Sequence, residues 1–402
     1  MYSVREIAPK LYWVGGSDRR LALFENMFPL PNGVAYNSYL LMDEKTALID
    51  TVDASISALY LENVTHVLNG RDLDYLVINH MEPDHCANIE EIARRYPNMQ
   101  VIGNKKTFQL FEQFYSLDLS GRMLTVADGE ELSLGESVLR FCYTPMVHWP
   151  EVMFTYEVKR GALFSADAFG TFGAHAGNLF ADESDFATLY MDEARRYYTN
   201  IVGKYGPQVQ AALKRFKDAQ VNMICPLHGP IWRKDLDVIL NKYDLWSRYE
   251  PEQKGVLLFY ASMYGNTENA VSALANKLGQ LGVRDMRMYD VSKTHPSYII
   301  ADAFRYSHMV AASPTYNLHL YMPMEMLLRD MAALGLRGRK VALMGNHSWA
   351  SAALKSMQEI FAGMKDMETI GTPMDIRSTL KPSREEELDK MAEAIASSVL
   401  RG

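Results

Sequence analysis

Four side chains of types that bind metal ions lie within six positions of the sequence, at His80, Glu82, Asp84 and His85. They come directly after the apolar run YLVIN, which predicts a strand that ends in a loop. Alternation along an extended chain would send His80, Glu82 and Asp84 to one side. Imidazoles and carboxylates at this density are costly to remove from water unless a cation binds them. The cluster therefore predicts a metal site at the edge of a sheet.

Three more candidate ligands stand where later strand-like runs end, namely His148 after FCYTPMV, Asp167 after GALFSA and His228 after NMICPL. Loops at strand ends are where binding and catalytic residues gather. Together with the first cluster, these residues supply imidazoles and carboxylates for two metal ions. We expect Asp167 to bridge the ions at the roughly 3.5–4 Å separation of two-metal sites.

A second group of candidate binding residues lies in three loops of the C-terminal part. The first loop, residues 262–267, opens directly into a helical pattern, where small hydroxylated residues and a helix N-terminus favour a phosphate. No lysine follows as in a Walker loop, so a monophosphate fits better than a nucleoside triphosphate. Residues 313–317 and 345–349 follow two further apolar runs. The candidates are Ser262, Met263, Tyr264, Gly265, Asn266, Thr267, Ser313, Pro314, Thr315, Tyr316, Asn317, Gly345, Asn346, His347, Ser348 and Trp349.

Two kinds of architecture must position these groups. Up to about residue 250, short strand-like runs mix with helical patterns, as in an α+β sandwich, and one helical pattern extends over residues 185–219. From Val256 each short buried run precedes a helix, which predicts an α/β, doubly wound parallel sheet. Such sheets bind ligands beyond the carboxyl ends of their strands. We place the domains at 1–250 and 255–402, separated by the polar stretch EPEQKG.

Composition limits the class of protein. A chain of 402 residues is long enough for two domains. Its formal charge of −8 disfavours nucleic-acid binding, and it has no apolar run near the ~20 residues of a membrane helix. The first residues lack an export signal, and the three cysteines form no CxxC pair. We expect a cytoplasmic protein that binds neither nucleic acid nor membranes.

The pattern His-x-Glu-x-Asp-His followed by remote His, Asp and His resembles the metallo-β-lactamase superfamily. Glu82 stands where the zinc hydrolases have a histidine, and a carboxylate there favours iron over zinc. Together with the three loops, which resemble those of flavodoxin, this exchange resembles the flavodiiron proteins over nearly the entire chain. The resemblance implies two domains, a metallo-β-lactamase-like αββα sandwich followed by a flavodoxin-like doubly wound parallel sheet.

The resemblance also implies ligands and an activity. His80, Glu82 and His148 would bind one iron ion, and Asp84, His85 and His228 the other, with Asp167 between them. FMN would occupy the three loops, with Tyr316 and Trp349 beside its ring; near His347 the family more often has a glycine and an aromatic residue. The enzyme would reduce O2 to water, NO to N2O, or both. Electrons would come from rubredoxin or another low-potential donor.

Further residues and an assembly follow from the same resemblance. His175, Tyr197 and Tyr198 lie in segments that border the irons in this family, and core packing is the alternative role for the tyrosines. Family members assemble as head-to-tail homodimers, so we expect a dimer or a dimer of dimers in which the flavin of one chain lies beside the irons of the other.

Three other readings of the sequence remain. One is a zinc-dependent metallo-β-lactamase-fold hydrolase with an FMN-binding electron-carrier domain, and metal analysis distinguishes it. A second is an electron carrier that uses FMN alone, against which the complete ligand set argues. A third is an oxidase that takes electrons from a reduced deazaflavin. The sequence leaves the choice between O2 and NO open, as it does the donor.

Overall fold

The computed structural model describes residues 1–401, which form two compact units. The first unit contains Met1–Tyr198 and Pro207–Asp244, and the second contains Thr199–Gly206 and Leu245–Gly402. The domain limits predicted from the sequence, 1–250 and 255–402, remain predictions. Each unit is described below by itself.

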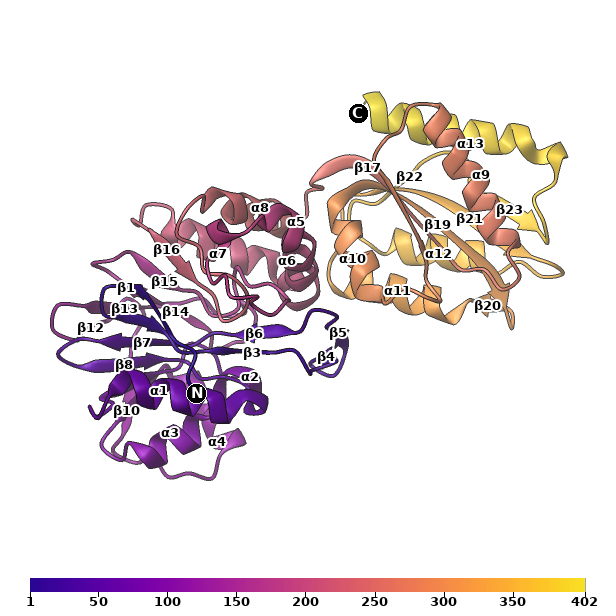
Figure 1. Ribbon diagram of the computed structural model, residues 1–402. Helices are drawn as coiled ribbons and strands as arrows, with labels where there is room; N and C mark the ends of the chain where they lie inside the picture. Colours follow the sequence, from indigo (N-terminus) through magenta and orange to yellow (C-terminus); the bar gives the residue numbers. More distant parts are fainter. Residues whose placement is uncertain (402) are drawn as a thin grey trace. The chain divides into compact units, whose positions relative to one another are not determined.

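Two facing sheets form the centre of the first unit (Figure 1). In the first sheet, the strands that run from β8 to β11 are parallel and the others antiparallel. Its order is β1 (Arg5–Ala8), β2 (Leu11–Trp13), β7 (Tyr39–Met42), β8 (Thr46–Ile49), β9 (Tyr75–Val77), β10 (Gln100–Gly103), β11 (Met123–Thr125). The second sheet is ordered β12 (Glu131–Ser133), β13 (Val138–Tyr143), β14 (Met153–Glu157), β15 (Ala162–Phe164), β16 (Met223–Cys225). Two smaller pairs are β3 (Gly16–Asp18) with β6 (Val34–Tyr36), and β4 (Leu23–Phe24) with β5 (Phe28–Pro29).

The core between the sheets follows from the alternation of side chains along each strand. Side chains two residues apart point to the same face of a strand, and the side chains on the faces between the two sheets are apolar. Those that meet between the sheets include Tyr39, Leu41, Ala47 and Ile49 from the first sheet, and Leu139, Phe141, Met153 and Phe164 from the second.

Helices cover the outer faces of both sheets (Figure 1). On the side of the first sheet lie α1 (Ser57–Leu68), α2 (Pro83–Cys86), α3 (Ile89–Arg95) and α4 (Lys105–Phe114). On the side of the second lie α5 (Phe186–Leu189), α6 (Met191–Tyr197), α7 (Gly206–Phe216) and α8 (Asp237–Ser247). Short helical turns of this unit are η1 (Ala54–Ile56) and η2 (Ala181–Glu183), whereas η4 (Gly203–Tyr205) and all of η3 (Tyr198–Val202) except Tyr198 belong to the second unit. The unit is the αββα sandwich that the sequence predicts.

One helical prediction for this part of the chain is wrong in detail. The pattern over residues 185–219 is divided into α5, α6, the π-helical turn η3, the 3-10 turn η4 and α7. Gly206 and Pro207 explain where the last helix begins, because proline is favoured at the first turn of a helix and disfavoured inside one.

The second unit is built around a parallel sheet ordered β18 (Met286–Asp290), β17 (Gln253–Tyr260), β19 (Tyr306–Tyr316), β21 (Lys340–His347), β22 (Glu368–Thr369). Strand β23 (Met374–Arg377) also pairs with β21, and β20 (His319–Leu320) pairs antiparallel with β19. Numbered along the chain, the parallel order is 2-1-3-4-5, the order of flavodoxin.

Helices lie on both faces of this sheet (Figure 1). On one face, α9 (Asn266–Gln280) and α13 (Glu385–Arg401) pack on each other and share a core with β17, β19 and β21. On the other face are α10 (Pro296–Arg305), α11 (Met322–Ala333) and α12 (Ala353–Ala362), and the turn η5 (Pro382–Arg384) precedes α13. Because both faces are covered, strand β17 is buried from Gly255 to Tyr260. The predicted flavodoxin-like, doubly wound sheet is confirmed.

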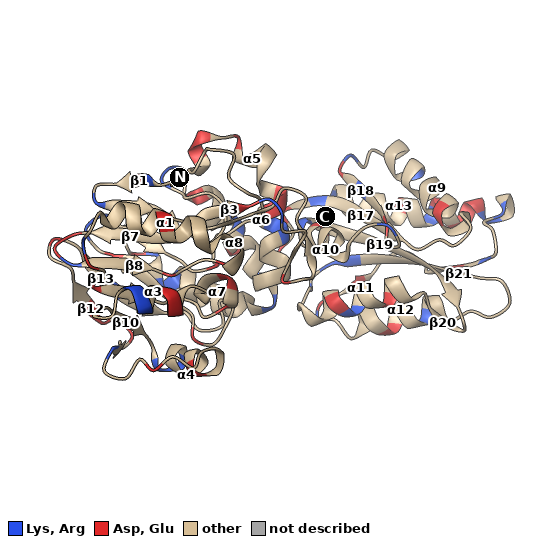
Figure 2. Ribbon diagram, turned by 60° about the horizontal axis from the view of Figure 1, so that its bottom comes forward, with Lys and Arg blue, Asp and Glu red and all other residues tan. Residues whose placement is uncertain are grey.

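The distribution of charged residues and the polarity of the helices are those expected from the composition. Acidic and basic residues are interspersed over both units (Figure 2). Within residues 1–401, every helix is too short or too polar to cross a lipid bilayer.

Candidate metal and cofactor sites

A short helix, rather than a strand, arranges the cluster around His80. Strand β9 ends at Val77, and α2 starts at Pro83, so Asp84 and His85 lie on a helical turn. The prediction that alternation would send His80, Glu82 and Asp84 to one side is wrong for Asp84, because Pro83 is pre-set for the start of a helix. The break separates the cluster into two groups that serve different positions.

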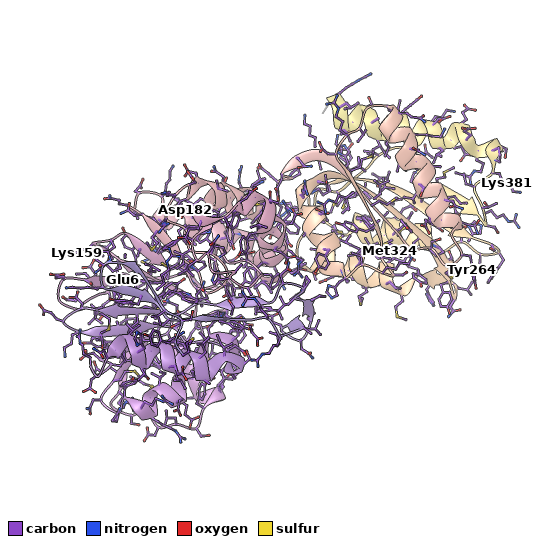
Figure 3. All side chains as sticks on the ribbon, viewed as in Figure 1. Glu6, Lys159, Asp182, Tyr264, Met324 and Lys381 are labelled. Carbon is purple, nitrogen blue, oxygen red and sulfur yellow. The ribbon has the colours of Figure 1, made fainter. Side chains whose placement is uncertain are left out.

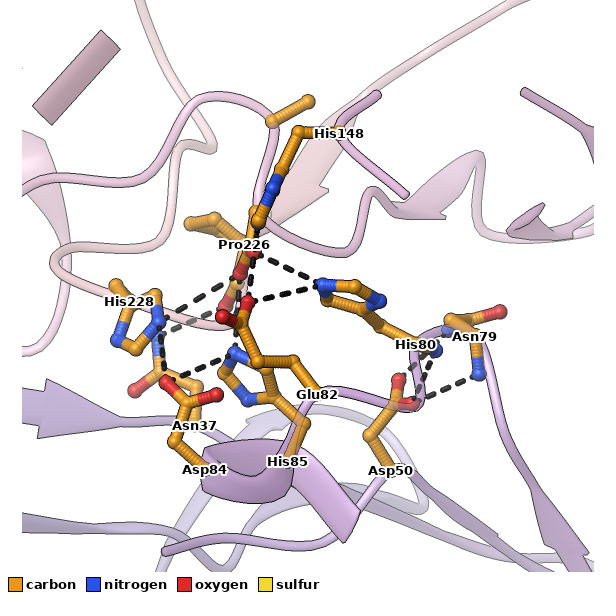
Figure 4. A network of polar contacts seen from close by, with 12 residues as sticks. Asn37, Asp50, Asn79, His80, Glu82, Asp84, His85, His148, Pro226 and His228 are labelled. Atoms are coloured by element: carbon orange, nitrogen blue, oxygen red, sulfur yellow. Dashed lines mark hydrogen bonds and ion pairs between the residues drawn. The ribbon is translucent and has the colours of Figure 1, made fainter. Parts of the chain in front are cut away.

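The first group, called here the first metal position, contains His80, Glu82, His148 and Asp167, all buried. Nε2 of His148 lies 3.0 Å from Oε2 of Glu82 and 3.0 Å from Oδ2 of Asp167. Nε2 of His80 lies 3.2 Å from the same Glu82 oxygen and 3.3 Å from the same Asp167 oxygen. The ligand atoms converge on one small volume (Figure 4).

The second metal position is formed by Asp84, His85 and His228. Oδ2 of Asp84 lies 3.3 Å from Nε2 of His85 and 3.3 Å from Nε2 of His228. Oδ1 of Asp167 lies 3.0 Å from Nε2 of His85 and 3.5 Å from Nε2 of His228. The two oxygens of Asp167 thus face different positions, as a bridging carboxylate requires.

Hydrogen bonding shows why these positions suit cations. The backbone oxygen of Ala35 can only accept, so Nδ1 of His228 donates to it at 2.8 Å. In a neutral ring Nε2 is then bare, yet it faces the carboxylates of Asp84 and Asp167. In the described part of the chain, both oxygens of Asp84 and both ring nitrogens of His85 have no hydrogen-bond partner. Acceptors that face acceptors in a buried site fit a metal ion.

Protons would otherwise take the place of the cation. Burial lowers the pKa of His148, but its hydrogen bonds with Asp167 and Glu82 outweigh burial and raise that pKa to about 9. Burial raises the pKa of Glu82, and its hydrogen bonds with His148 and His80 reverse this and hold the pKa below its usual range. Metal binding at such a site releases protons, because imidazole ligands must be deprotonated.

Backbone strain occurs beside two of the ligands. Ala166, directly before Asp167, has φ +48°, and Met146, two residues before His148, has φ +64°. Such conformations cost about 1–3 kcal/mol each and are found where a structure fixes functional side chains. Asp50, itself at φ +52°, holds the other loop by accepting the backbone N–H of Asn79 at 2.7 Å and of His80 at 3.1 Å.

The predicted pocket residues lie at different distances from the ligands. Tyr197 ends α6, is fully buried, and places its ring 5.4 Å from that of His228. In the described residues its hydroxyl has no hydrogen-bond partner. Tyr198 packs instead on Tyr243, with ring centroids 4.8 Å apart.

His175 is connected to the ligand His228 through Asn37. Its Nε2 lies 3.2 Å from Oδ1 of Asn37. The amide nitrogen of Asn37 donates to the backbone oxygens of Pro226 and Gly229, on either side of His228. A catalytic role of His175 and Tyr197 remains a prediction.

Three carboxylates near the ligands were not predicted from the sequence as site residues: Glu25, Asp50 and Glu151. Asp50 ends the buried run TALID, so a signal existed, whereas Glu25 lies in the β4–β5 hairpin with no such pattern around it. Burial and the neighbouring carboxylate of Glu82 raise the pKa of Glu25 to about 8. Glu151 is completely buried behind His80.

The second site is a cavity of about 310 Å³ at the carboxyl ends of β17, β19 and β21. All three predicted loops line it, although Gly265, Ser313 and Gly345 do not themselves do so. Leu318, Ala350 and Ser378 also line it and were not predicted. Tyr264, labelled in Figure 3, is 91% exposed and Trp349 is 86% exposed at its mouth. Exposed aromatic rings around a cavity suit a flat aromatic ligand.

The first of these loops is shaped for an anion. Gly265 has φ +86°, which glycine adopts without strain, and α9 begins at the next residue. The hydroxyl of Ser262 accepts the N–H of Gly265 at 3.1 Å and of Glu268 at 3.4 Å. In the third loop Nδ1 of His347 lies 3.1 Å from Oδ1 of Asp375. The lining contains no lysine or arginine, so a phosphate would be held by backbone N–H and hydroxyl groups.

Comparison with known proteins decides the family. Residues 34–229 match the family described as ODP family beta lactamase, and residues 258–388 match flavodoxin. The nitric oxide reductase of Moorella thermoacetica is 31% identical over 370 residues, which cover 91% of each chain. This chain belongs to the flavodiiron protein family.

Other flavodiiron relatives agree in sequence and in structure. The anaerobic nitric oxide reductase flavorubredoxin of Aeromonas hydrophila is 30% identical, over 87% of this chain and 70% of the relative. Rubredoxin oxygen:oxidoreductase from Desulfovibrio gigas superposes with a TM-score of 0.92 at 28% identity, over 99% of this chain and 98% of that one. Like these relatives, the flavodiiron chain is an oxidoreductase.

Proposed function

We propose that this flavodiiron protein reduces O2 to water, NO to N2O, or both, at two iron ions, with electrons passed through FMN. The observation that carries the proposal is the division of the buried ligands into two groups that share Asp167. The flavodoxin-like domain supplies the flavin site in the same chain. The names of the relatives from Moorella and Desulfovibrio support both substrates.

The first metal position would hold one iron through His80, Glu82, His148 and Asp167, and the second position would hold the other through Asp84, His85, His228 and Asp167. Three carboxylates among seven ligands favour iron over zinc. Iron held by these residues would offer open coordination positions for a diatomic gas and would pass on to it the electrons received through FMN.

The flavin pocket would bind FMN with the phosphate in the loop of residues 262–267, at the N-terminus of α9. Tyr264, Tyr316 and Trp349 would cover the isoalloxazine ring, and the backbone of residues 345–349 would contact its polar edge. FMN can exchange electrons one at a time, so it could pass single electrons from a carrier such as rubredoxin to the two irons.

Residues around the irons would handle the proton and exclude water. The buried hydroxyl of Tyr197 has no partner in the described chain, the tyrosine ring lies 5.4 Å from that of His228, and this hydroxyl would donate to a bound substrate. Phe24 and Phe172 pack around the same tyrosine, with centroids 6.3 and 5.1 Å away. We also propose that electrons come from rubredoxin or a similar low-potential donor, and that the chain assembles as a head-to-tail dimer or a dimer of dimers.

The proposal is tested by quantifying iron, zinc and FMN in protein purified without added metal. The expected result is about two irons and one FMN per chain. Anaerobic turnover with reduced donor then assigns the substrate, by N2O formation from NO and by O2 consumption. Two zinc ions per chain and no reaction with either gas would contradict the proposal and indicate a hydrolase.

A further inference from the structure

Glu151 is a buried carboxylate directly behind one ligand of the first metal position. It is 0% exposed and lies in the loop between His148 and β14. Its Oε1 accepts the backbone N–H of Met81 at 2.9 Å and lies 2.8 Å from Nδ1 of His80. Because an ionised carboxylate can only accept, Nδ1 of His80 is the donor in the second contact. The ring of His80 is thereby fixed with Nε2 bare and directed at Glu82 and Asp167.

His85 and His228 differ from His80, because in the described residues neither has an anionic partner at Nδ1. Nδ1 of His228 donates to the neutral backbone oxygen of Ala35. Nδ1 of His85 has no hydrogen-bond partner in residues 1–401. Both of these rings belong to the second metal position. The negative hydrogen-bond partner is therefore placed behind the first position.

Within the described chain, the charge of Glu151 has no lysine or arginine to balance it, and its Oε2 has no hydrogen-bond partner. A buried carboxylate in this state is stabilised when the histidine that it contacts binds a positive metal ion through its other ring nitrogen. A carboxylate partner also makes a histidine a stronger donor to its metal. Stronger donation favours the more positive oxidation state of the ion that His80 would bind.

We propose that Glu151 is a positioning residue that orients His80 and lowers the reduction potential of the first metal position relative to the second. The inference rests on the proposed diiron centre. When the centre holds one ferric and one ferrous ion, the ferric ion occupies the first position.

The test is a redox titration of the iron-loaded, FMN-containing Glu151→Gln variant, followed by EPR and Mössbauer spectroscopy. Glutamine keeps an oxygen that accepts from Met81 and His80 and removes only the charge. We expect two irons to remain, and the equilibrium constant for reducing the first position to rise about tenfold, an upward shift of about 59 mV for one electron. The potential of the second position is the internal control and should move less.

Glu151→Asp is the matched variant, because it keeps the charge but draws it away from His80. It should shift the first potential in the same direction by less, and it serves as the test if Glu151→Gln does not fold. Loss of iron from the first position alone would equally support the positioning role. Unchanged potentials in a variant with two irons would overturn the inference and leave the proposed function standing. Absence of iron from the wild-type protein would overturn the proposed function instead.

Discussion

Oδ1 of Asp167 lies 3.0 Å from Nε2 of His85. The second oxygen of the same carboxylate faces the first metal position, so Asp167 is the residue that the two positions share. Asp84, in contrast, belongs to the second position only. Substitutions of these two acids should therefore differ in how many ions they remove.

Asp167→Ala should reduce bound iron from about two per chain toward zero, whereas Asp84→Ala should leave about one. The reason is that the first variant removes a ligand from both positions and the second from one. Iron per chain, measured by mass spectrometry on protein whose fold is verified by circular dichroism, checks the difference. Equal losses in the two variants would argue against a bridging Asp167.

Asn266→Asp should separate the stability of the flavodoxin-like domain from its affinity for FMN. A carboxylate in the first turn of α9 should stabilise the FMN-free protein by about 0.3–1 kcal/mol through the helix dipole. The same charge should repel the FMN phosphate and weaken binding at least about tenfold, or about 1.4 kcal/mol. Thermal unfolding of the FMN-free protein and FMN titration followed by flavin fluorescence measure the two effects.

The neutral variant Asn266→Ser is the control for that experiment. It should change FMN affinity much less than Asn266→Asp, because it adds no charge next to the phosphate. If both variants bind FMN as the wild type does, the phosphate does not lie at the start of α9.

Tyr197→Phe should make the protein more stable and less active. The buried hydroxyl has no partner in the described residues, so its removal should stabilise the fold by about 1 kcal/mol. Turnover with O2 or NO should fall roughly 10²-fold if the hydroxyl donates to the substrate, while the iron content is unchanged. Tyr60→Phe is the control, because the Tyr60 hydroxyl is also buried but contacts Ser38. That variant should lose stability and keep its activity.

His175 should make folding stability depend on pH. Burial and then the nearby charge of Arg19 lower its pKa to about 4, below the ordinary value near 6.5. A depressed folded-state pKa means that the unfolded chain binds the proton more tightly, so the contribution is complete above pH 6.5 and is lost as the pH falls toward 4. The loss amounts to up to about 3 kcal/mol.

Urea unfolding of metal-free protein at pH 7, 6, 5 and 4 measures this loss. His175→Asn, which can still hydrogen-bond to Asn37, should show a flatter dependence on pH over that range than the wild type. Identical dependence in the two proteins would mean that folding does not lower the pKa of His175.

The sequence indicated candidate site residues where the chemistry depends on residue type and strand ends. His80, His148, Asp167 and His228 each follow an apolar run, and these four residues lie together with the other candidate ligands once the sheets form. The three loops around the cavity were found for the same reason, because carboxyl ends of parallel strands meet. Two fold classes were predicted because mixed strand-like and helical runs give way to regular strand–helix alternation near residue 255.

The sequence did not predict features that depend on tertiary contacts. Glu151 acts through His80, 71 positions away in the chain, and no local pattern marks that pairing. Glu25 approaches Glu82 only because the β4–β5 hairpin folds over the ligands. The helical turn of α2 stands where the sequence indicated an extended loop, because Pro83 favours the start of a helix. These residues surround the ligands without themselves following a strand-end pattern.

The most direct test of the diiron–flavin account is a rapid-mixing experiment on the fully reduced protein. The protein, with iron and FMN quantified, is mixed anaerobically with O2 or with NO while flavin absorbance is recorded. The account predicts fast flavin reoxidation by at least one gas, and loss of that fast phase in Asp167→Ala with FMN still bound. Equally fast reoxidation in the wild type and in Asp167→Ala would contradict it, because the flavin would then react without the metal centre.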